Sequence, residues 1–172
     1  ITKEFPKHQF AWKVLGVVLI QIGRLSESLI STQKSVELSP LDSEAHYNLG
    51  IILKVLDRLN EAEASYRKAI ALKPNYAEAY NNLAITLKYL GRSNEAEASY
   101  RKAITLKPNY AEAYYNLADT LELGRLNEAE ASYRKAITLK PDYAEAYNNL
   151  GSTLKDLGRI DDALSNYNKA IE

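Results

Sequence analysis

The sequence repeats itself with a period of about 34 residues, and this period restricts what the chain can fold into. Its five prolines, which lie 34, 34, 34 and 33 residues apart, are Pro6, Pro40, Pro74, Pro108 and Pro141. A unit of this length accommodates two antiparallel helices and two turns. Because such a unit buries its apolar face only by stacking on its neighbours, the period predicts an array of stacked helix pairs.

Two helical patterns alternate within each unit. In the third unit both helices carry apolar residues at helical spacing, namely Tyr80, Leu83, Ala84 and Leu87, then Ala96, Tyr100, Ala103 and Ile104. Gly91 separates the two patterns and predicts the end of the first helix. An Asn or Asp followed three residues later by Glu predicts a capping box. This pattern occurs before the first helices at Asn75, Asn109 and Asp142, and before the second helices at Asn60, Asn94 and Asn127.

These features resemble the tetratricopeptide repeat (TPR) family. The stretch WKVLG from Trp12 to Gly16 matches the opening of that repeat. An alanine four residues before a tyrosine, as in Ala62 and Tyr66, and the closing proline match it as well. The resemblance implies an all-α, right-handed superhelical solenoid of antiparallel helix pairs, with a concave face lined by the first helices. The chain is then a single array, residues 1–172, of five units at 9–42, 43–76, 77–110, 111–143 and 144–172, with residues 1–8 as the tail of a preceding repeat.

Three departures from the pattern carry expectations of their own. Ser28 and Thr32 replace the Ala and Tyr of the other units, so the first unit is expected to pack more weakly. Asp57 stands where the other units have glycine, and Asp tolerates a left-handed conformation. The fourth unit lacks one residue after Glu122, and we expect the turn before Gly124 to absorb it. A changed superhelix pitch that reshapes the groove is the alternative.

Composition and motifs exclude several classes of function. Lys plus Arg and Asp plus Glu both number 22, so the chain lacks the basic field that nucleic-acid binding needs. The sequence contains no apolar run of about 18 residues, which is the length that a membrane-spanning helix needs. It also contains no Cys. His8 and His46 lie in different units, and no metal-ligand, phosphate-loop or nucleophile motif occurs. We therefore expect no cofactor and no enzymatic activity. We also expect the protein to be cytoplasmic. Glu63 and Arg67, with their counterparts Glu97 and Arg101 and Glu130 and Arg134, predict surface ion pairs worth about 0.3–0.5 kcal/mol each.

A column of asparagines is the most informative candidate site. One Asn directly precedes the packing leucine of the first helix in four successive units, at Asn48, Asn82, Asn116 and Asn149. An amide offers both a donor and an acceptor, so the column predicts binding to the backbone of an extended peptide. The column resembles the asparagine ladder in the TPR part of O-linked N-acetylglucosamine transferases. Two alternatives are that the amides were copied by duplication, or that they bond across units and fix their stacking.

Helical spacing places further residues on the same surface. The predicted peptide-binding set also contains Tyr47, Asn81, Tyr115, Asn148, Ile51, Ile85, Lys54 and Lys88, and the same register reaches Asp119 and Ser152. Most of the thirteen tyrosines are expected in the core, whereas Tyr47, Tyr89 and Tyr115 lie off the packing stripe. No unit carries the Lys and Asn, four residues apart, with which some TPR proteins clamp a peptide carboxylate.

The sequence thus predicts a non-catalytic scaffold that binds protein or peptide segments on the inner face of the array. One alternative is the substrate-recruiting arm of a larger enzyme, such as a glycosyltransferase. Another is a structural module that associates head to tail through uncapped ends. No nucleic-acid partner and no membrane partner are expected.

Overall fold

The structure is a computed structural model that describes residues 7–121 and 123–171. These residues form helices and turns, with no strand among them. Most of the segment predicted as the tail of a preceding repeat lies outside the described residues, and so does Glu122. The chain divides into two compact parts, an N-terminal part (residues 1–91) and a C-terminal part (residues 92–172).

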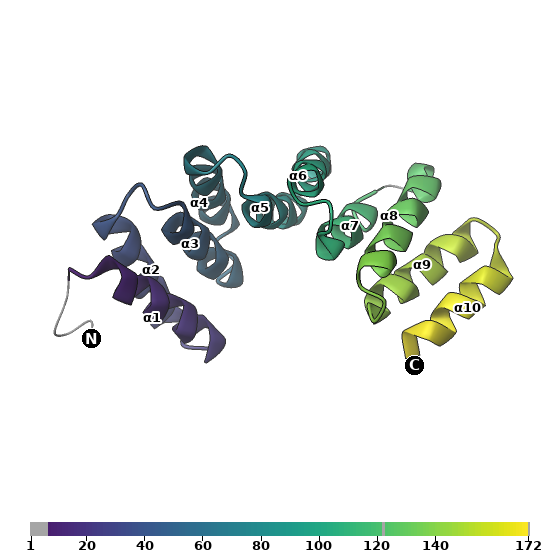
Figure 1. Ribbon diagram of the computed structural model, residues 1–172, viewed down its shortest axis with the longest axis horizontal. Helices are drawn as coiled ribbons and strands as arrows, with labels where there is room; N and C mark the ends of the chain where they lie inside the picture. Colours follow the sequence, from purple (N-terminus) through teal and green to yellow (C-terminus); the bar gives the residue numbers. More distant parts are fainter. Residues whose placement is uncertain (1–6, 122, 172) are drawn as a thin grey trace. The chain divides into compact units, whose positions relative to one another are not determined.

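Each part is a succession of helices joined by short turns (Figure 1). The N-terminal part contains α1 (Gln9–Gln21), α2 (Leu25–Leu38), α3 (Ser43–Val55), α4 (Leu59–Leu72) and α5 (Ala77–Tyr89). The C-terminal part contains α6 (Ser93–Leu106), α7 (Ala111–Ala118), the short 3-10 helix η1 (Leu123–Arg125), α8 (Leu126–Leu139), α9 (Ala144–Asp156) and α10 (Ile160–Ile171).

Packing follows the repeat in both parts. The first helix of a unit packs on the second, as in α1 with α2, α3 with α4, α7 with α8 and α9 with α10. Each second helix also packs on the first helix that follows it, as α4 does on α5 and α8 on α9. The all-α fold of helix pairs that the period predicts is therefore confirmed.

Close approach within a pair depends on a small residue in the first helix. A Cβ added to Gly50 would come within 2.6 Å of the Tyr66 ring, and one added to Gly151 within 2.8 Å of the Tyr167 ring. In the first pair Thr32 takes the place of the tyrosine, 2.6 Å from a Cβ built on Gly16. The ring thus fills the space that the missing Cβ leaves.

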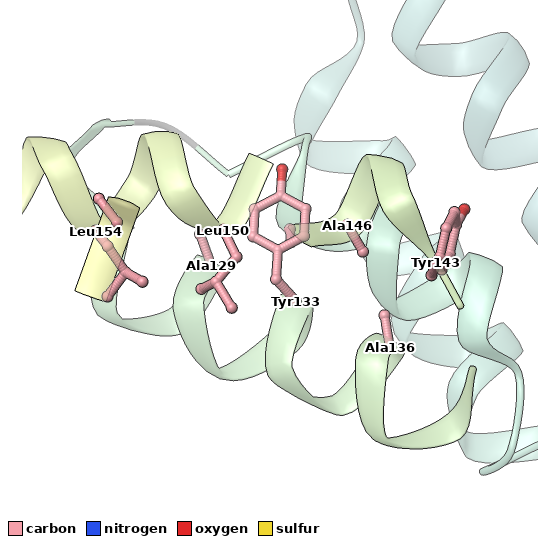
Figure 2. Close-up of a cluster of buried hydrophobic side chains, with 9 residues drawn as sticks. Ala129, Tyr133, Ala136, Tyr143, Ala146, Leu150 and Leu154 are labelled. Carbon is pink, nitrogen blue, oxygen red and sulfur yellow. The ribbon is translucent and has the colours of Figure 1, made fainter. Parts of the chain in front are cut away.

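The core of the C-terminal part is a cluster of buried side chains, most of them from α8 and α9, with Ala118 of α7 and Ala163 of α10 (Figure 2). The ring of Tyr133 stands in the middle of this cluster, between Leu150 and Ala146. Tyr133 is 4% exposed, and Leu150 is 1% exposed. The alternation of alanine with large side chains that the sequence shows thus builds the interface between the helices.

The predicted capping boxes are wrong. The N-caps of α5, α7 and α9 are Tyr76, Tyr110 and Tyr143, and none of them forms a side-chain capping bond. The asparagine or aspartate before each tyrosine lies outside the helix. Tyr143 is only 9% exposed, and burying an aromatic ring there outweighs a side-chain cap that contributes about 1 kcal/mol.

The second helices, by contrast, begin two residues earlier than the capping pattern predicts. Their N-caps are Arg58, Arg92 and Arg125, again without a side-chain capping bond, so Asn60, Asn94 and Asn127 lie inside the first turn. Each arginine instead forms a two-pronged ion pair with an acidic residue three positions later, as Arg58 does with Glu61 at 2.7 Å. A carboxylate in the first helical turn also suits the helix dipole.

Ion pairs on the second helices confirm the predicted spacing of four. Arg67 Nε lies 2.8 Å from Glu63, and the same pair recurs between Arg101 and Glu97 at 2.9 Å and between Arg134 and Glu130 at 2.8 Å. In the C-terminal part the pairs also join successive second helices, because Arg125 binds Glu97 at 2.6 Å and Arg159 binds Glu130 at 2.8 Å.

The turns within pairs contain a residue with positive φ. Gly23, Gly91 and Gly158 have φ between 74° and 77°, and Asp57 has φ 58°. The expected left-handed conformation of Asp57 is therefore confirmed. Gly124 differs, because it lies in η1 and is not among the residues with positive φ.

In the fourth unit the first helix ends early, at Ala118, and the missing residue falls beyond this end and before Gly124, as expected, while α8 keeps 14 residues as in α4. α7 ends at Ala118 after 8 residues, whereas α3 has 13. Seven residues, 119–125, join Ala118 to α8, whereas eight, 51–58, join Gly50 to α4. Non-helical backbone spans about 3.3 Å per residue and a helix about 1.5 Å. Unwinding the end of α7 therefore lets fewer residues cover the distance while Ala118 and Ala129 stay buried.

Candidate peptide-binding face

The predicted asparagine column lies on the first helices α3, α5, α7 and α9. Asn48 is buried, and Asn82, Asn116 and Asn149 are partly buried. In the first unit Val14 takes this position and is 43% exposed. The column therefore lies at the edge of the core rather than fully in solvent.

The amide of Asn82 is engaged by the protein itself. Its nitrogen donates to the hydroxyl of Tyr47 at 3.0 Å and to the carbonyl oxygen of Glu78 at 3.1 Å. Its oxygen accepts a hydrogen bond from Lys54 Nζ at 2.9 Å. Because an amide has two N–H donors, Asn82 uses its full donor capacity; its bonds to Tyr47 and Lys54 join α3 to α5, and its bond to Glu78 lies within α5. The alternative that the amides fix the stacking of units is confirmed at this position.

Tyrosines surround this hydrogen bond in the N-terminal part. The ring of Tyr47 lies 4.9 Å from that of Tyr76 and 6.0 Å from that of Tyr66, and Lys73 Nζ lies 4.3 Å from the centre of the Tyr76 ring. Burial and the Glu78 carboxylate raise the pKa of Tyr47, and burial lowers the pKa of Lys54. Tyr47 is therefore part of the packing, not off it as predicted.

The C-terminal part repeats this cluster with different neighbours. Asn149 donates to the hydroxyl of Tyr115 at 3.1 Å, and Asn148 donates to the amide oxygen of Asn149 at 3.3 Å. The Tyr115 ring lies 5.0 Å from Tyr143 and 5.8 Å from Tyr133. Burial raises the pKa of Tyr143 to about 12 and, together with Asp119, raises the pKa of Tyr133. Tyr115 thus also packs, contrary to the prediction.

The other predicted residues have varied environments. Asn81 is 4% exposed, and Asn148 lies exposed on the surface. Tyr89 is 72% exposed, as its position off the packing stripe predicts. The remaining members, all partly buried, are Ile51, Ile85, Lys54 and Lys88.

Two hollows of the C-terminal part are lined by predicted residues. The smaller, of about 400 Å³, is lined by Tyr115, Asn148 and Asn149, with Ala144, Glu145, Ala170 and Ile171. The larger, of about 740 Å³, also contains Asn149, with Ser152, Asp119 and residues of the shortened α7 end. Asn149 therefore lies between two concave sites on one surface.

Sequence reasoning missed Asp156, which lines the larger hollow. It lies seven residues after Asn149, two turns further along α9, where the third unit has Tyr89. Extending the predicted face by one further helical step would have found it. The hollow itself arises from the early end of α7, which the sequence pattern did not predict.

Lys13, which lies one position before the column in the first unit, is held by carboxylates. Its Nζ lies 2.6 Å from Glu44 and 3.1 Å from Asp42. Burial lowers its pKa, but the bonds with Glu44 and Asp42 outweigh this and raise it.

The two histidines, for which the sequence predicts no metal-binding role, both contact backbone groups. The side chain of His8 caps the start of α1, and His46 Nε2 lies 2.9 Å from the Pro40 carbonyl oxygen.

Within residues 7–121 and 123–171, no group of three or more His, Cys, Asp or Glu residues lies close enough to hold a metal ion. In the same residues no helix has the length and apolar character needed to cross a bilayer.

Family models match most of the array. Two models described as tetratricopeptide repeat match residues 41–109 and 99–131, and one described as TPR repeat matches residues 120–158. Together they span residues 41–158. No curated protein sequence matches the chain.

Solved structures share the fold over nearly the whole chain. MamA is 27% identical, with a TM-score of 0.81 over 91% of this chain and 92% of the MamA chain. PilF of Pseudomonas aeruginosa is 22% identical, with a TM-score of 0.88 over 95% of this chain and 75% of its own. YrrB, described as a TPR protein with an unusual peptide-binding site, is 23% identical, with a TM-score of 0.76 over 99% of this chain and 88% of its own.

Proposed function

Because this chain belongs to the tetratricopeptide repeat family, we propose that it is a protein-interaction scaffold that binds an extended peptide segment on the face of its first helices. The observation that carries the proposal is the hollow of about 400 Å³ lined by Tyr115, Asn148 and Asn149. Three of the residues selected by helical register thus line one concave site. An aromatic ring beside the exposed amide of Asn148 and the partly buried amide of Asn149 suits a peptide, whose backbone needs both donors and acceptors.

The hydrogen bonds divide the asparagines into two roles. Asn82 holds Tyr47, Lys54 and its own helix, so a peptide would have to displace one of these bonds. Asn148 is exposed, and its bond to Asn149 is long at 3.3 Å. We therefore assign backbone contacts to Asn148 first and a positioning role to Asn82. The proposed face also includes the other residues that helical register selects, namely Asn48, Asn116, Ile51, Ile85, Asn81, Lys88, Asn149, Tyr47, Tyr115 and Lys54.

The likeness to YrrB favours the same class of ligand, since that protein is described as having a peptide-binding site. Affinity on such a face comes from many modest contacts over a preformed surface. The proposal includes no catalytic step and no cofactor. It applies equally to an independent scaffold and to the recruiting arm of a larger enzyme.

Selection from a library of random nonapeptides, acetylated and amidated at their ends, tests the proposal. We expect the protein to enrich peptides, and we expect Asn148→Ala to weaken the enriched peptides about fivefold, as the loss of one hydrogen bond predicts. Asn168→Ala, an exposed asparagine on α10, is the matched control and should leave binding unchanged. A failure to enrich any peptide, or equal binding by both variants, would count against the proposed face.

A further inference from the structure

The larger hollow of the C-terminal part is a consequence of the shortened helix. It has a volume of about 740 Å³ and lies where α7 ends, against α8 and α9. One side is formed by Ala118, Asp119 and Leu121, at and beyond the end of α7. In the second unit, residues 51–55 of α3 continue as helix past the corresponding point.

The lining of this hollow combines an apolar wall with a polar rim. Apolar atoms come from Leu121, Leu126 and Ala129, and from the ring of Tyr133, which is 4% exposed. Figure 2 shows this ring rising from α8 toward α9. Polar lining residues are Asn149, Ser152 and the buried Thr153, together with the exposed Asp119 and Asp156. Such a combination suits a ligand with an apolar stem and a polar, charged end.

The charged side chains among the described residues that line the hollow are all negative. Asp119 and Asp156 are both exposed, and the described residues that line the hollow include no lysine or arginine. The negative charge of Asp119 acts inside the cluster, since it contributes to raising the pKa of Tyr115 and Tyr133. A cation is therefore attracted to this hollow and an anion is repelled.

The acidic character is specific to this part of the array. Ile51 stands at the position of Asp119 in the second unit, and Ile85 at the position of Ser152 in the third. Tyr89 stands at the position of Asp156. In the N-terminal part the same register is thus apolar, and Lys54 adds a positive charge beside Asn82. The first helices of the two parts therefore differ in the chemistry of this register.

We propose that the hollow between the end of α7, α8 and α9 is a specificity pocket for one lysine or arginine side chain of the bound peptide. The methylene stem packs against Leu121 and Leu126, and the cation lies at the rim beside Asp119 and Asp156. Asn149 and Ser152, which are hydrogen-bonded to Tyr115 and Tyr167, line the hollow next to it. This inference rests on the proposed peptide-binding function, because the pocket opens beside Asn149 on the same face.

The pocket also predicts discrimination. A glutamate at the same peptide position meets two carboxylates of like charge, and an alanine leaves the apolar wall unfilled. The preference concerns a single position of the peptide, because the acidic pair occurs at one place in the described array. The rest of the peptide is read mainly through its backbone.

The test is selection from the same library of capped random nonapeptides, followed by comparison of residue frequencies at each position. We expect Lys and Arg to be enriched about tenfold at one position with the unmodified protein. In the double variant Asp119→Asn and Asp156→Asn the enrichment should fall to about twofold or less, while peptide binding itself persists. The Asn side chains keep the volume of the originals, so the fold is expected to survive, and circular dichroism checks it.

A matched double variant separates a local effect from overall charge. Asp142→Asn with Asp161→Asn changes the net charge equally at exposed positions that do not line this pocket, and it should keep the basic preference. If peptides are enriched without a basic position, or if the preference survives the first double variant, the pocket assignment is wrong and the proposed function stands. If no peptide is enriched, the proposed function fails, and the pocket assignment fails with it.

Discussion

The second and fourth units contain the same cluster, built on helices that differ in length. In both, a tyrosine of the first helix stacks on two others and receives a hydrogen bond from an asparagine of the next unit: Tyr47 from Asn82 at 3.0 Å, and Tyr115 from Asn149 at 3.1 Å. α3 continues for 13 residues, whereas α7 stops after 8. The cluster therefore does not depend on the last turn of the helix.

The last turn instead decides what lies beside the cluster. In the N-terminal part it carries Lys54, whose Nζ bonds the oxygen of Asn82. In the C-terminal part that turn is absent, and a hollow of about 740 Å³ opens beside Asn149. The early end of α7, together with Asp119 and Asp156 at positions where the second and third units have Ile51 and Tyr89, thus replaces a filled, lysine-bonded surface with an open acidic one. A repeat array can gain a local site in this way without changing the packing of its neighbouring helices.

Deleting Val55 is expected to change stability the most, because it gives the second unit the same one-residue deletion that the fourth unit has. Val55 is the counterpart of the missing residue and is 49% exposed. We expect α3 to unwind after Gly50, exposing Ile52 and Leu53, which are now 0% and 3% exposed. The cost should be about 3 kcal/mol or more in the free energy of unfolding, as for other losses of large core side chains. Urea denaturation measures it.

The reciprocal change is its control. Inserting a tyrosine between Glu122 and Leu123 restores the spacing of the third unit, so α7 should extend by about five residues to the length of α5. Far-ultraviolet circular dichroism should show more helix, and the basic preference of the pocket should be lost. An unchanged helix content on insertion, together with an unharmed Val55 deletion, would show that the missing residue is not what shortens α7.

The two buried tyrosines of the second helices provide a smaller contrast. The hydroxyl of Tyr66 is buried without a hydrogen-bond partner among the described residues. The hydroxyl of Tyr133 interacts with Asn149, and Tyr133 is among the residues that line the hollow. Because an unpaired buried polar group costs about 1–3 kcal/mol, Tyr66→Phe should stabilise the fold by about 1 kcal/mol. Tyr133→Phe should be neutral or slightly destabilising. Thermal unfolding of both variants checks this, and equal shifts would contradict it.

The sequence predicts the repeat period and the helix pairs because both depend on local spacing and on apolar stripes. It also predicts the left-handed Asp57 and the ion pairs of Glu63, Glu97 and Glu130, which involve residues close in sequence. The capping boxes of the first helices fail because a tyrosine at the N-cap gains more by burial than an asparagine gains by capping, and those of the second helices fail because an arginine takes the N-cap and forms an ion pair with a glutamate. Such a competition between local and tertiary energy is not visible in a motif.

The sequence predicts only part of the candidate site, because the rest depends on contacts between units and on the chain conformation after α7. Helical register selects Tyr115, Asn148 and Asn149, and these residues do line one hollow. The bonds that engage Asn82 come from Tyr47 and Lys54, 35 and 28 residues away. The pocket with Asp119 and Asp156 arises from the conformation of the chain after α7. Neither can be inferred from spacing within one unit.

Ion pairs at the start of the second helices give the smallest expected contrast. Arg125 binds both Glu128 of its own helix and Glu97 of α6, each at 2.6 Å. Arg58 binds Glu61 at 2.7 Å, and the position that corresponds to Glu97 is occupied by Leu29. Arg125→Gln should therefore lower the melting temperature more than Arg58→Gln does, because it also breaks a link between helices. Since salt screens exposed charges, the difference should shrink in 1 M NaCl, where the Debye length is about 3 Å. A difference that persists in high salt would indicate that Arg125 acts through the packing of its side chain rather than through its charge.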